Sequence, residues 1–470
     1  MHKDNTFFSV TLCVNKVFFM EGERNMVKKG NKLAIQMAIG LVLGLVCGVS
    51  CIYLRESLIA SGNQETWTMI NHVLFQDISA QDATSAIGLF YILGQLFVNS
   101  LQLIIVPMVF TSIAMAICRV SDTKKLGRIS YKTITWFMFT TALSLTLAGI
   151  IGMVVYNMGG FNVVIEGVNQ STGSTGSNPL LVFAQIIPNN IISVFGNNGK
   201  VLSIVFLAVC TGLAINQLGD RVSIVRKLLQ EVNDIVVTFL TYVINKFGPL
   251  AIFVLITRTF AIYGVEHLKP ALTYVITTTM VLFIFLLIGY PTLMTMVTRL
   301  NPIKFLKKIA KVAVFGFSTS SSAATLPLNQ KTVTEELGVG EEIASFVLPM
   351  GMTINMDGTA IMQTIAAIFV ASCGGYNVTI SSVLIIALLA LVASIGTPAA
   401  PGAGAVILFT ILSGMGYVNE GALMAYSLIL AINRPIEMLV TSLNVVGDST
   451  TCMYVAKSEG MLDEEVFNKE

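Results

Sequence analysis

The sequence predicts an all-α polytopic membrane protein with eight transmembrane helices and two re-entrant helical hairpins. Of its 470 residues, 54% are hydrophobic and only 11% are charged, whereas about 25% of the residues in an ordinary soluble domain are charged. Apolar runs of about 20 residues, the length that crosses a bilayer, recur along the chain. Late in the chain, polar residues interrupt such runs near their centres, which favours hairpins over plain spans.

Composition and charge also exclude several classes of protein. The formal net charge is +2, and the basic residues lie in short loops, so we expect no nucleic-acid partner. The seven cysteines lie mostly in apolar runs without a C-x-x-C pair, and the three histidines form no motif, so a disulfide framework or zinc site is not expected. We find no nucleophile–base pair or phosphate-binding loop, and we expect neither an enzyme nor an organic cofactor.

The first six spans are predicted from apolar length alone. They cover residues 33–53, 87–117, 129–157, 180–216, 232–262 and 271–298. Lys and Arg collect in every second loop, starting with Lys28, Lys29 and Lys32, and such loops face the cytoplasm. We therefore expect a multi-pass protein of the plasma (cell inner) membrane with both termini cytoplasmic. We expect residues 1–30 to be a cytoplasmic extension that the fold does not need, with Met26 as a plausible alternative start.

Two later apolar segments, 312–329 and 379–416, are interrupted by Ser318–Ser322 and by Ser394–Pro398. Non-helical backbone at membrane depth persists only when it is buried in protein or lines a wet cavity. We therefore predict a re-entrant hairpin near 303–334, entering from the cytoplasm, and a second near 379–416, entering from outside.

A span follows each hairpin, at 343–371 and at 421–457. The order hairpin, span, hairpin, span is typical of an inverted repeat, in which discontinuous segments mark the binding site. Both spans have polar centres, Asn355-Met-Asp-Gly-Thr359 and Asn444-Val-Val-Gly-Asp-Ser-Thr450.

Polar residues on the last span recur at helical spacing, which puts them on one face. They are Asn433, Glu437, Thr441, Asn444 and Asp448. Polar side chains can simply join helices in a membrane, but buried acids are costly and usually functional. Together with Asn355 and Asp357 they offer hard oxygen ligands, which suit sodium or a proton.

Three further features bear on function. The Ser318–Ser322 turn offers hydroxyl groups, and the backbone N–H groups at the start of the following helix would face a carboxylate. Gly396, Gly402 and Gly404 would let the tip of the second hairpin bend as a gate. Arg434 would pair with Glu437, reach the outer interface, or contact an anionic substrate group.

These motifs carry a resemblance. The chain resembles the dicarboxylate/amino acid:cation symporters, the glutamate-transporter family, over nearly all of residues 31–460. The matching stretches are Ser320-Ser-Ser-Ala-Ala-Thr-Leu-Pro327, Asn355-Met-Asp-Gly-Thr359, Ser394-Ile-Gly-Thr397, Pro401-Gly-Ala-Gly404, Asn444-Val-Val-Gly-Asp448 and Ile105-Val-Pro-Met-Val-Phe110.

The resemblance implies a homotrimer in the lipid bilayer that works as an elevator-type transporter. Residues 31–262 would be mostly a fixed scaffold for trimerisation, except that span 129–157 would belong with the moving part. Residues 263–457, with both hairpins, would be mostly the transport domain, and 458–470 a cytoplasmic tail.

The resemblance also implies sodium as the coupling ion. One site would lie near Gly351, Asn355, Asn444 and Asp448, and a second would join Asn355 and Asp357 to Thr140 and Thr141. A third would use backbone carbonyls of Ser394, Ile395 and Thr397. Met356 stands where sodium-coupled members carry Met, which favours sodium over protons.

For the substrate, an amino acid, the resemblance places the α-carboxylate against Ser321, Ser322 and Asn444. The α-amino group would meet Glu437, where the family usually has Asp, and Thr441. The expected site is completed by Ser320, Thr359, Gly404 and Val440.

Members that carry acidic substrates have an arginine at the position of Val440 or Ser320. Because an unpaired buried carboxylate is costly, we predict symport of a small neutral amino acid such as serine, threonine, alanine or cysteine. One alternative is a sodium- or proton-coupled symporter of an acidic amino acid or C4-dicarboxylate, with Arg434 as the counter-charge. The other is a uniporter or anion channel.

Overall fold

The computed structural model describes residues 35–78, 85–118, 124–162, 186–198, 200–264, 268–395, 397–399 and 402–469. Within these ranges the protein is helical, and the β-structure is one isolated bridge between Val339 and Leu462. The predicted extension 1–30, most of the loop 158–179, and the hairpin-tip residues Gly396 and Pro401 lie outside the described residues.

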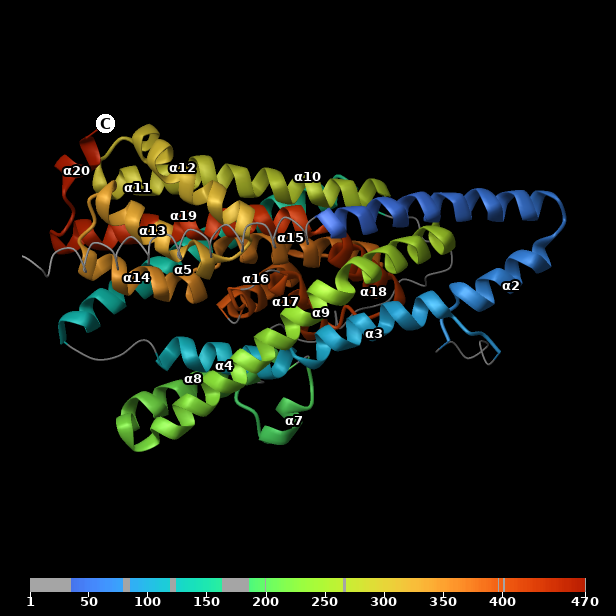
Figure 1. The fold of residues 1–470 in the computed structure, drawn as a ribbon, viewed down its shortest axis with the longest axis horizontal. Coiled ribbons are helices and arrows are strands. Elements are labelled where there is room, and N and C mark those ends of the chain that lie inside the picture. Colours follow the sequence, from blue (N-terminus) through green and yellow to red (C-terminus); the bar gives the residue numbers. More distant parts are fainter. Residues whose placement is uncertain are drawn as a thin grey trace, which may run out of the picture.

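Six helical stretches of the described chain are long and apolar enough to cross a membrane. They are Ile35–Ala60, Leu89–Cys118, Gly127–Asn157, Leu202–Ile262, Lys269–Thr298 and Glu341–Cys373, and the bent pair Glu420–Ile432 and Arg434–Glu459 makes a seventh. The chain reverses direction at the 3₁₀ turn η1 (Gly219–Val222), so that Leu202–Ile262 contains two arms (Figure 1). The prediction of a multi-pass helical membrane protein is confirmed.

One group of helices comes from the first half of the chain. It contains Ile35–Ala60, α3 (Leu89–Leu103), α4 (Ile105–Cys118), α8 (Val201–Leu218) and α9 (Ser223–Tyr263), and α4 packs on both α8 and α9. The outer helix α2 (Gln64–Leu74) comes directly after Ile35–Ala60 in the chain.

Glycine spacing explains how Ile35–Ala60 approaches α9. Gly40, Gly44 and Gly48 recur every fourth residue, which makes a stripe of the kind that lets two membrane helices pack closely. A Cβ atom at Gly40 would lie 2.5 Å from the Pro249 carbonyl oxygen, and one at Gly48 would lie 2.6 Å from Cβ of Phe260. Larger residues on this stripe would therefore force the two helices apart.

The second group surrounds α15 (Asp357–Cys373), in which every residue except Ser372 is buried. A helix with no exposed face belongs in the centre of a large helical protein. Its neighbours include α5 (Lys124–Asn157), α10 (Leu268–Ile284), α18 (Glu420–Ile432) and α19 (Arg434–Glu459). The predicted span 129–157 thus packs with the second half of the chain.

Two helical hairpins pack in the second group. The first consists of α12 (Pro302–Thr319) and α13 (Ser322–Glu335), and the second of α16 (Ile380–Ile395) and α17 (Ala403–Gly414). The first tip turns at Ser320, whose φ is 50°, and at the extended Ser321. The two tips meet, because the Ser321 hydroxyl donates a hydrogen bond to the Ala399 carbonyl at 3.0 Å.

The predicted helix 180–216 is wrong in its first part. The long helix α8 begins only at Val201, and a separate short helix, α7 (Ile191–Phe195), precedes it. Asn190 caps α7 by accepting a hydrogen bond from the Ser193 N–H, and the helix ends at Gly196. A prediction from the length of an apolar run takes no account of these capping signals.

The two spans with polar centres are also not continuous helices. The span at 343–371 divides into α14 (Glu341–Ile354) and α15, with Asn355 and Met356 between them. The span at 421–457 divides at Asn433, where α18 and α19 meet at 70°. Pro435 at the start of α19 favours this break, because it lacks an N–H to continue α18. Asn433 therefore does not share the straight helical face of Glu437, Thr441, Asn444 and Asp448.

The C-terminal segment is packed rather than free. Its helix α20 (Glu464–Asn468) is capped by Asp463, and the Phe467 side chain is completely buried. The Lys308 ammonium, from the first hairpin, donates hydrogen bonds to the carbonyl oxygens of Glu336, Phe467 and Lys469 at 3.0, 2.8 and 3.0 Å. This ammonium joins the base of the hairpin to the C-terminal segment.

Replacing Lys308 by methionine is expected to lower the thermal unfolding midpoint and to expose the C-terminal segment to protease. Two of the three hydrogen bonds are partly buried and one is exposed, and hydrogen bonds to a charged group contribute about 1.5–3 kcal/mol each at most. Limited proteolysis followed by mass spectrometry of the released C-terminal peptides measures the exposure. Lys307→Met is the matched control because Lys307 is exposed, and equal protease sensitivity of the two variants would contradict the role of Lys308.

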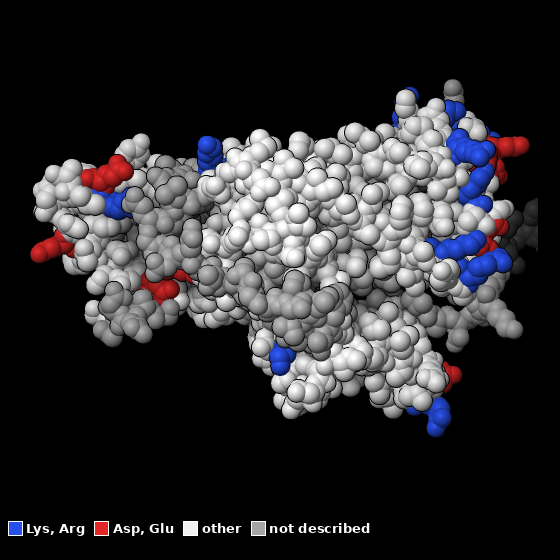
Figure 2. Space-filling view, turned by 180° about the vertical axis from the view of Figure 1, so that it is seen from behind, with Lys and Arg blue, Asp and Glu red and all other residues white. Residues whose placement is uncertain are grey.

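The same end of the molecule carries most of the Lys and Arg visible in Figure 2. There, Arg128 and Lys132 of α5 both form ion pairs with Glu459 at the end of α19. One turn beyond Lys132, the Trp136 ring stacks on Tyr454 with centroids 4.0 Å apart. These contacts fix α5 to α19, two of the helices that contribute to the site below.

Candidate functional site

The site forms where helix α14 stops and α15 begins. Asn355 and Met356 have non-helical backbone angles, and helix α15 resumes at Asp357. Such a break frees backbone N–H and C=O groups inside the protein. Polar side chains from α5, α11 (Tyr290–Thr298) and α19 surround this break.

Asp357 is completely buried between two hydroxyl groups. Its Oδ1 accepts a hydrogen bond from Thr141 of α5 at 2.5 Å, and its Oδ2 accepts one from Tyr290 of α11 at 2.8 Å. Thr140, predicted with Thr141, is also buried, and its hydroxyl donates to the Phe137 carbonyl. The structure therefore brings Thr141 to Asp357, with Thr140 next to Thr141 on α5.

Asp448 forms the second acidic part of the site. Its Oδ1 accepts a hydrogen bond from Asn355 Nδ2 at 3.0 Å, and it lies so close to Gly351 that a Cβ there would be 2.3 Å from this oxygen. The other Asn355 atom, Oδ1, is buried without a hydrogen-bond partner. A buried, unpaired amide oxygen on a side chain that contacts a carboxylate is a ready ligand for a cation.

The electrostatics of this cluster also favour a cation. Asp357 and Asp448 are both buried, and the described residues provide neither with an ion pair. Burying charges without a partner costs several kcal/mol or more. The described part of the chain has no cluster of three or more His, Cys, Asp or Glu that could hold a transition metal. The ligand chemistry fits a hard monovalent cation or a proton.

A cavity of about 30 Å³ lies beside this acidic cluster, between the hairpin tips, α15 and α19. Eight of the nine predicted substrate residues line it, namely Ser320, Ser322, Thr359, Gly404, Glu437, Val440, Thr441 and Asn444. The ninth, Ser321, is used elsewhere, because its hydroxyl donates to Ala399 and accepts the Ala324 N–H at 3.3 Å. We call this space the substrate cavity.

Asn444 connects the substrate cavity to the ion ligands. Its Oδ1 accepts the Gly358 N–H at 2.8 Å, and its Nδ2 lies 3.3 Å from the Thr359 hydroxyl and 3.2 Å from the Met356 sulfur. On the opposite wall, the Ser320 hydroxyl is buried without a partner. The Ser320 hydroxyl is therefore available to a polar ligand, whereas the Asn444 amide already has partners within the protein.

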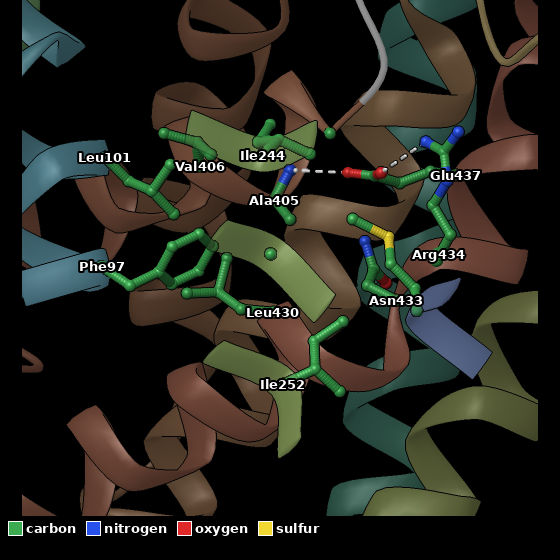
Figure 3. Close-up of a pocket in the computed structure, with 13 residues that line it drawn as sticks. Phe97, Leu101, Ile244, Ile252, Ala405, Val406, Leu430, Asn433, Arg434 and Glu437 are labelled. Atoms are coloured by element: carbon green, nitrogen blue, oxygen red, sulfur yellow. Dashed lines mark hydrogen bonds and ion pairs between the residues drawn. The ribbon is translucent and has the colours of Figure 1, made fainter. Parts of the chain in front are cut away.

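Glu437 lies at the boundary of two cavities. Its Oε1 accepts the Ala405 N–H at 3.2 Å, and its Oε2 lies 3.7 Å from Nη1 of Arg434 (Figure 3). Arg434 and Asn433 line a different cavity, whose walls are mainly apolar residues of α3, α9, α17 and α18. The expected i,i+3 ion pair of Arg434 is confirmed, and its guanidinium does not line the substrate cavity.

The predicted carbonyl ligands of the second hairpin lie further toward the first group of helices. Ser394 and Ile395 end α16, and Ile395 and Thr397 line a larger cavity of about 400 Å³. That cavity also touches Thr353 of α14 and Asn233 of α9. Thr397 is shared between it and the substrate cavity.

Sequence reasoning missed three neighbours of the site. They are Tyr290, Met362 in the substrate cavity, and Gln363, whose Nε2 donates to the Gly404 carbonyl at 3.0 Å. Gln363 is a polar side chain in a largely apolar part of its span. This polarity could have identified it as a neighbour of the site. Tyr290 gives no such signal, because tyrosine is common in apolar segments.

Comparison with known proteins decides the family. A model of the Sodium:dicarboxylate symporter family matches residues 33–458. The chain belongs to the sodium:dicarboxylate symporter family. The resemblance inferred from the motifs is thereby confirmed, and the protein is a multi-pass membrane transporter of the symporter class.

The names of the relatives that this chain resembles give different substrates. The chain is 30% identical over 383 residues to the proton/sodium-glutamate symport protein of Geobacillus stearothermophilus, covering 79% of this chain and 88% of the relative. It is 29% identical to a C4-dicarboxylate transport protein of Solibacter usitatus (80% and 87% covered) and 27% identical to an excitatory amino acid transporter of Caenorhabditis elegans (76% and 78% covered). The family therefore implies sodium or proton coupling and an amino acid or dicarboxylate substrate.

Proposed function

We propose that this symporter couples sodium to the uptake of a small neutral amino acid across the plasma membrane. The observation that carries the proposal is the chemistry of the substrate cavity. Its described lining has one carboxylate, Glu437, one amide, Asn444, and several hydroxyls, but no Lys or Arg. This set complements an ammonium and a single carboxylate.

The substrate groups follow from these partners. The α-amino group binds Glu437, which is the only charged side chain in the described lining. The α-carboxylate binds Asn444 and the N-terminus of α13, where Ser322 lies, because helix N-termini favour anions. A second carboxylate on the substrate would lie near Val440 without a cation, and leaving it unpaired costs several kcal/mol.

Sodium occupies the acidic cluster in this proposal. Asp357, Asp448 and the free Asn355 oxygen supply hard ligands, and hard ligands suit sodium. Because Asn444 contacts both Met356 and Thr359, ordering the break between α14 and α15 around sodium also positions the substrate amide. Binding of the two solutes is thereby coupled, as reciprocal linkage requires.

Release requires a hairpin tip to move. The substrate cavity, about 30 Å³, holds roughly two water molecules at about 10–15 Å³ each. The second tip, with Pro398 and Ala399 on the cavity wall, is the gate in this proposal.

We also propose that the group around α15 moves as an elevator against the first group of helices, in a homotrimer. In this proposal the protein transports solutes without catalysing a covalent reaction.

A second candidate has support from the comparisons. The named relatives are glutamate, glutamate-aspartate and C4-dicarboxylate symporters, which favours an acidic substrate. Arg434 would then leave Glu437 and serve as the counter-charge. Its Nε and Nη1 have no hydrogen-bond partner among the described residues, so this guanidinium could donate to an added carboxylate.

Uptake into liposomes tests both candidates. Purified protein is reconstituted with an imposed sodium gradient, and labelled serine, alanine, aspartate and succinate are offered separately. Accumulation of serine or alanine that collapses without the gradient supports the proposal, whereas accumulation of aspartate or succinate alone rejects it. Uptake that ignores both sodium and proton gradients would instead indicate a uniporter.

Val440→Arg is expected to convert the substrate preference toward aspartate. The added guanidinium would pair with a side-chain carboxylate, and a charge-assisted hydrogen bond of about 1.5–3 kcal/mol corresponds to roughly 10- to 100-fold in relative uptake. Competition of labelled serine by unlabelled aspartate measures the change. Val440→Gln controls for size without charge, and a gain with Val440→Gln equal to that with Val440→Arg would contradict the charge argument.

A further inference from the structure

Tyr290 begins helix α11 directly after an irregular turn. Residues Phe285–Gly289 form a π-helix, and the Tyr290 N–H bonds to the Phe285 carbonyl across five residues. Such single π turns occur frequently at functional sites. Since an α-helix turns about 100° per residue, the extra residue in this turn rotates Tyr290 relative to a regular continuation of α10. The rotation directs its phenol toward α15 and α19.

The phenol group is completely buried at the acidic cluster. Its hydroxyl donates to Asp357 Oδ2 at 2.8 Å. It also lies against α19 at Gly447, where a Cβ atom would be 2.2 Å from the hydroxyl oxygen and 2.7 Å from Asn355 Nδ2. The hydroxyl therefore contacts α15 at Asp357 and α19 at Gly447, two helices that hold proposed ion ligands.

The two hydroxyls on Asp357 are not equivalent. Thr141 has two acceptors within reach, Asp357 Oδ1 at 2.5 Å and the Phe137 carbonyl at 2.8 Å, but only one proton to donate. It can turn to Phe137 and leave its lone pairs and Oδ1 to a cation. For Tyr290, Asp357 Oδ2 is the acceptor that the described structure provides.

We infer that Tyr290 is a positioning residue of the ion site, which sets sodium affinity by holding Asp357 Oδ2 while Oδ1 and Thr141 take the cation. This inference rests on the proposed sodium coupling. A partner that orients a ligating carboxylate typically changes metal affinity by about 10- to 100-fold when it is removed. The hydroxyl contributes hydrogen bonding and orientation, while the aromatic ring fills space beside Phe285, 4.9 Å away between centroids.

Tyr290→Phe removes the hydroxyl and keeps the ring. The full-length protein is heated in detergent at increasing NaCl, with choline chloride holding ionic strength constant, and the sodium concentration for half-maximal stabilisation is recorded. We expect this concentration to rise about tenfold in the variant. Uptake measured in parallel should show the same rise in the KM for sodium, with the KM for the amino acid unchanged at saturating sodium.

Tyr376→Phe is the matched control. Tyr376 is also buried, and its hydroxyl accepts the Asn419 N–H at 3.2 Å away from the acidic cluster. Its loss should lower stability in choline without moving the sodium midpoint. An unchanged sodium midpoint in Tyr290→Phe, or equal shifts in both variants, would overturn the role of Tyr290. Absence of any sodium response in the wild-type protein would instead reject the proposed sodium coupling itself.

Discussion

Replacing Asp448 by asparagine is expected to remove sodium-dependent stabilisation and sodium-driven uptake at ordinary sodium concentrations. The substitution keeps the size of the side chain and its contact with Asn355, but it takes one of two negative charges from a buried cluster. In the proposed sodium-bound state, Asp448 and sodium form a buried ion pair. Removing one partner of such a pair costs about 3–5 kcal/mol, which corresponds to a loss of sodium affinity on the order of 100-fold or more. Thermal unfolding at increasing NaCl measures the loss directly.

Asp463→Asn provides the comparison for this variant. Asp463 is the exposed N-cap of α20, and asparagine caps helices about as well as aspartate, so its sodium response should match the wild type. If Asp448→Asn retained the wild-type sodium midpoint, Asp448 would have no place among the ion ligands. The proposal would then depend on Asp357 alone.

Replacing Glu437 by glutamine is expected to have the second-largest effect, on both stability and amino acid uptake. Arg434 is only 8% exposed, and without Glu437 its charge would be buried and unpaired, at a cost of about 3–5 kcal/mol. In addition, the α-amino group of the substrate would lose its charged partner. Losing a charge-assisted hydrogen bond reduces affinity by roughly 10- to 100-fold.

The double variant Glu437→Gln/Arg434→Met separates these two effects. Arg434 lines a mainly apolar cavity, so methionine is expected to restore the thermal unfolding midpoint by removing the unpaired charge. Amino acid uptake should remain low, because Glu437 is still missing. Recovery of uptake together with stability would show that Glu437 only neutralises Arg434, and it would contradict a contact with the substrate.

Much of the fold could be predicted because spanning a bilayer imposes a simple length rule. The hairpins were predictable from serine, glycine and proline inside apolar runs, where only buried or wet backbone is allowed. The short helix α7 and the 70° bend at Asn433 escaped prediction, because caps and bends depend on single residues that apolar length does not register. Pro435 lies at the bend, but proline is common in the first turn of any helix. This residue alone therefore does not predict a bend.

The acidic cluster could be predicted because its residues are conspicuous in a membrane span. Tyr290 could not, since its partner Asp357 lies 67 residues further along the chain and its direction depends on a π turn. The separation of Arg434 from the substrate cavity also required the structure. The sequence left three roles open for Arg434, and the structure places it in a cavity lined by residues of α3 and α9.

The stacked pair Trp136–Tyr454 gives the protein an internal optical reporter. The chain contains two tryptophans, and Trp136 lies one turn before Thr140 on α5, with its ring held against α19. The other, Trp67, packs near Phe75 on the outer helix α2 (Figure 1). In a Trp67→Phe background, one indole would monitor the relative position of the two helices that hold Thr141 and Asp448. Its fluorescence would follow ion binding in real time, without a label and without transport.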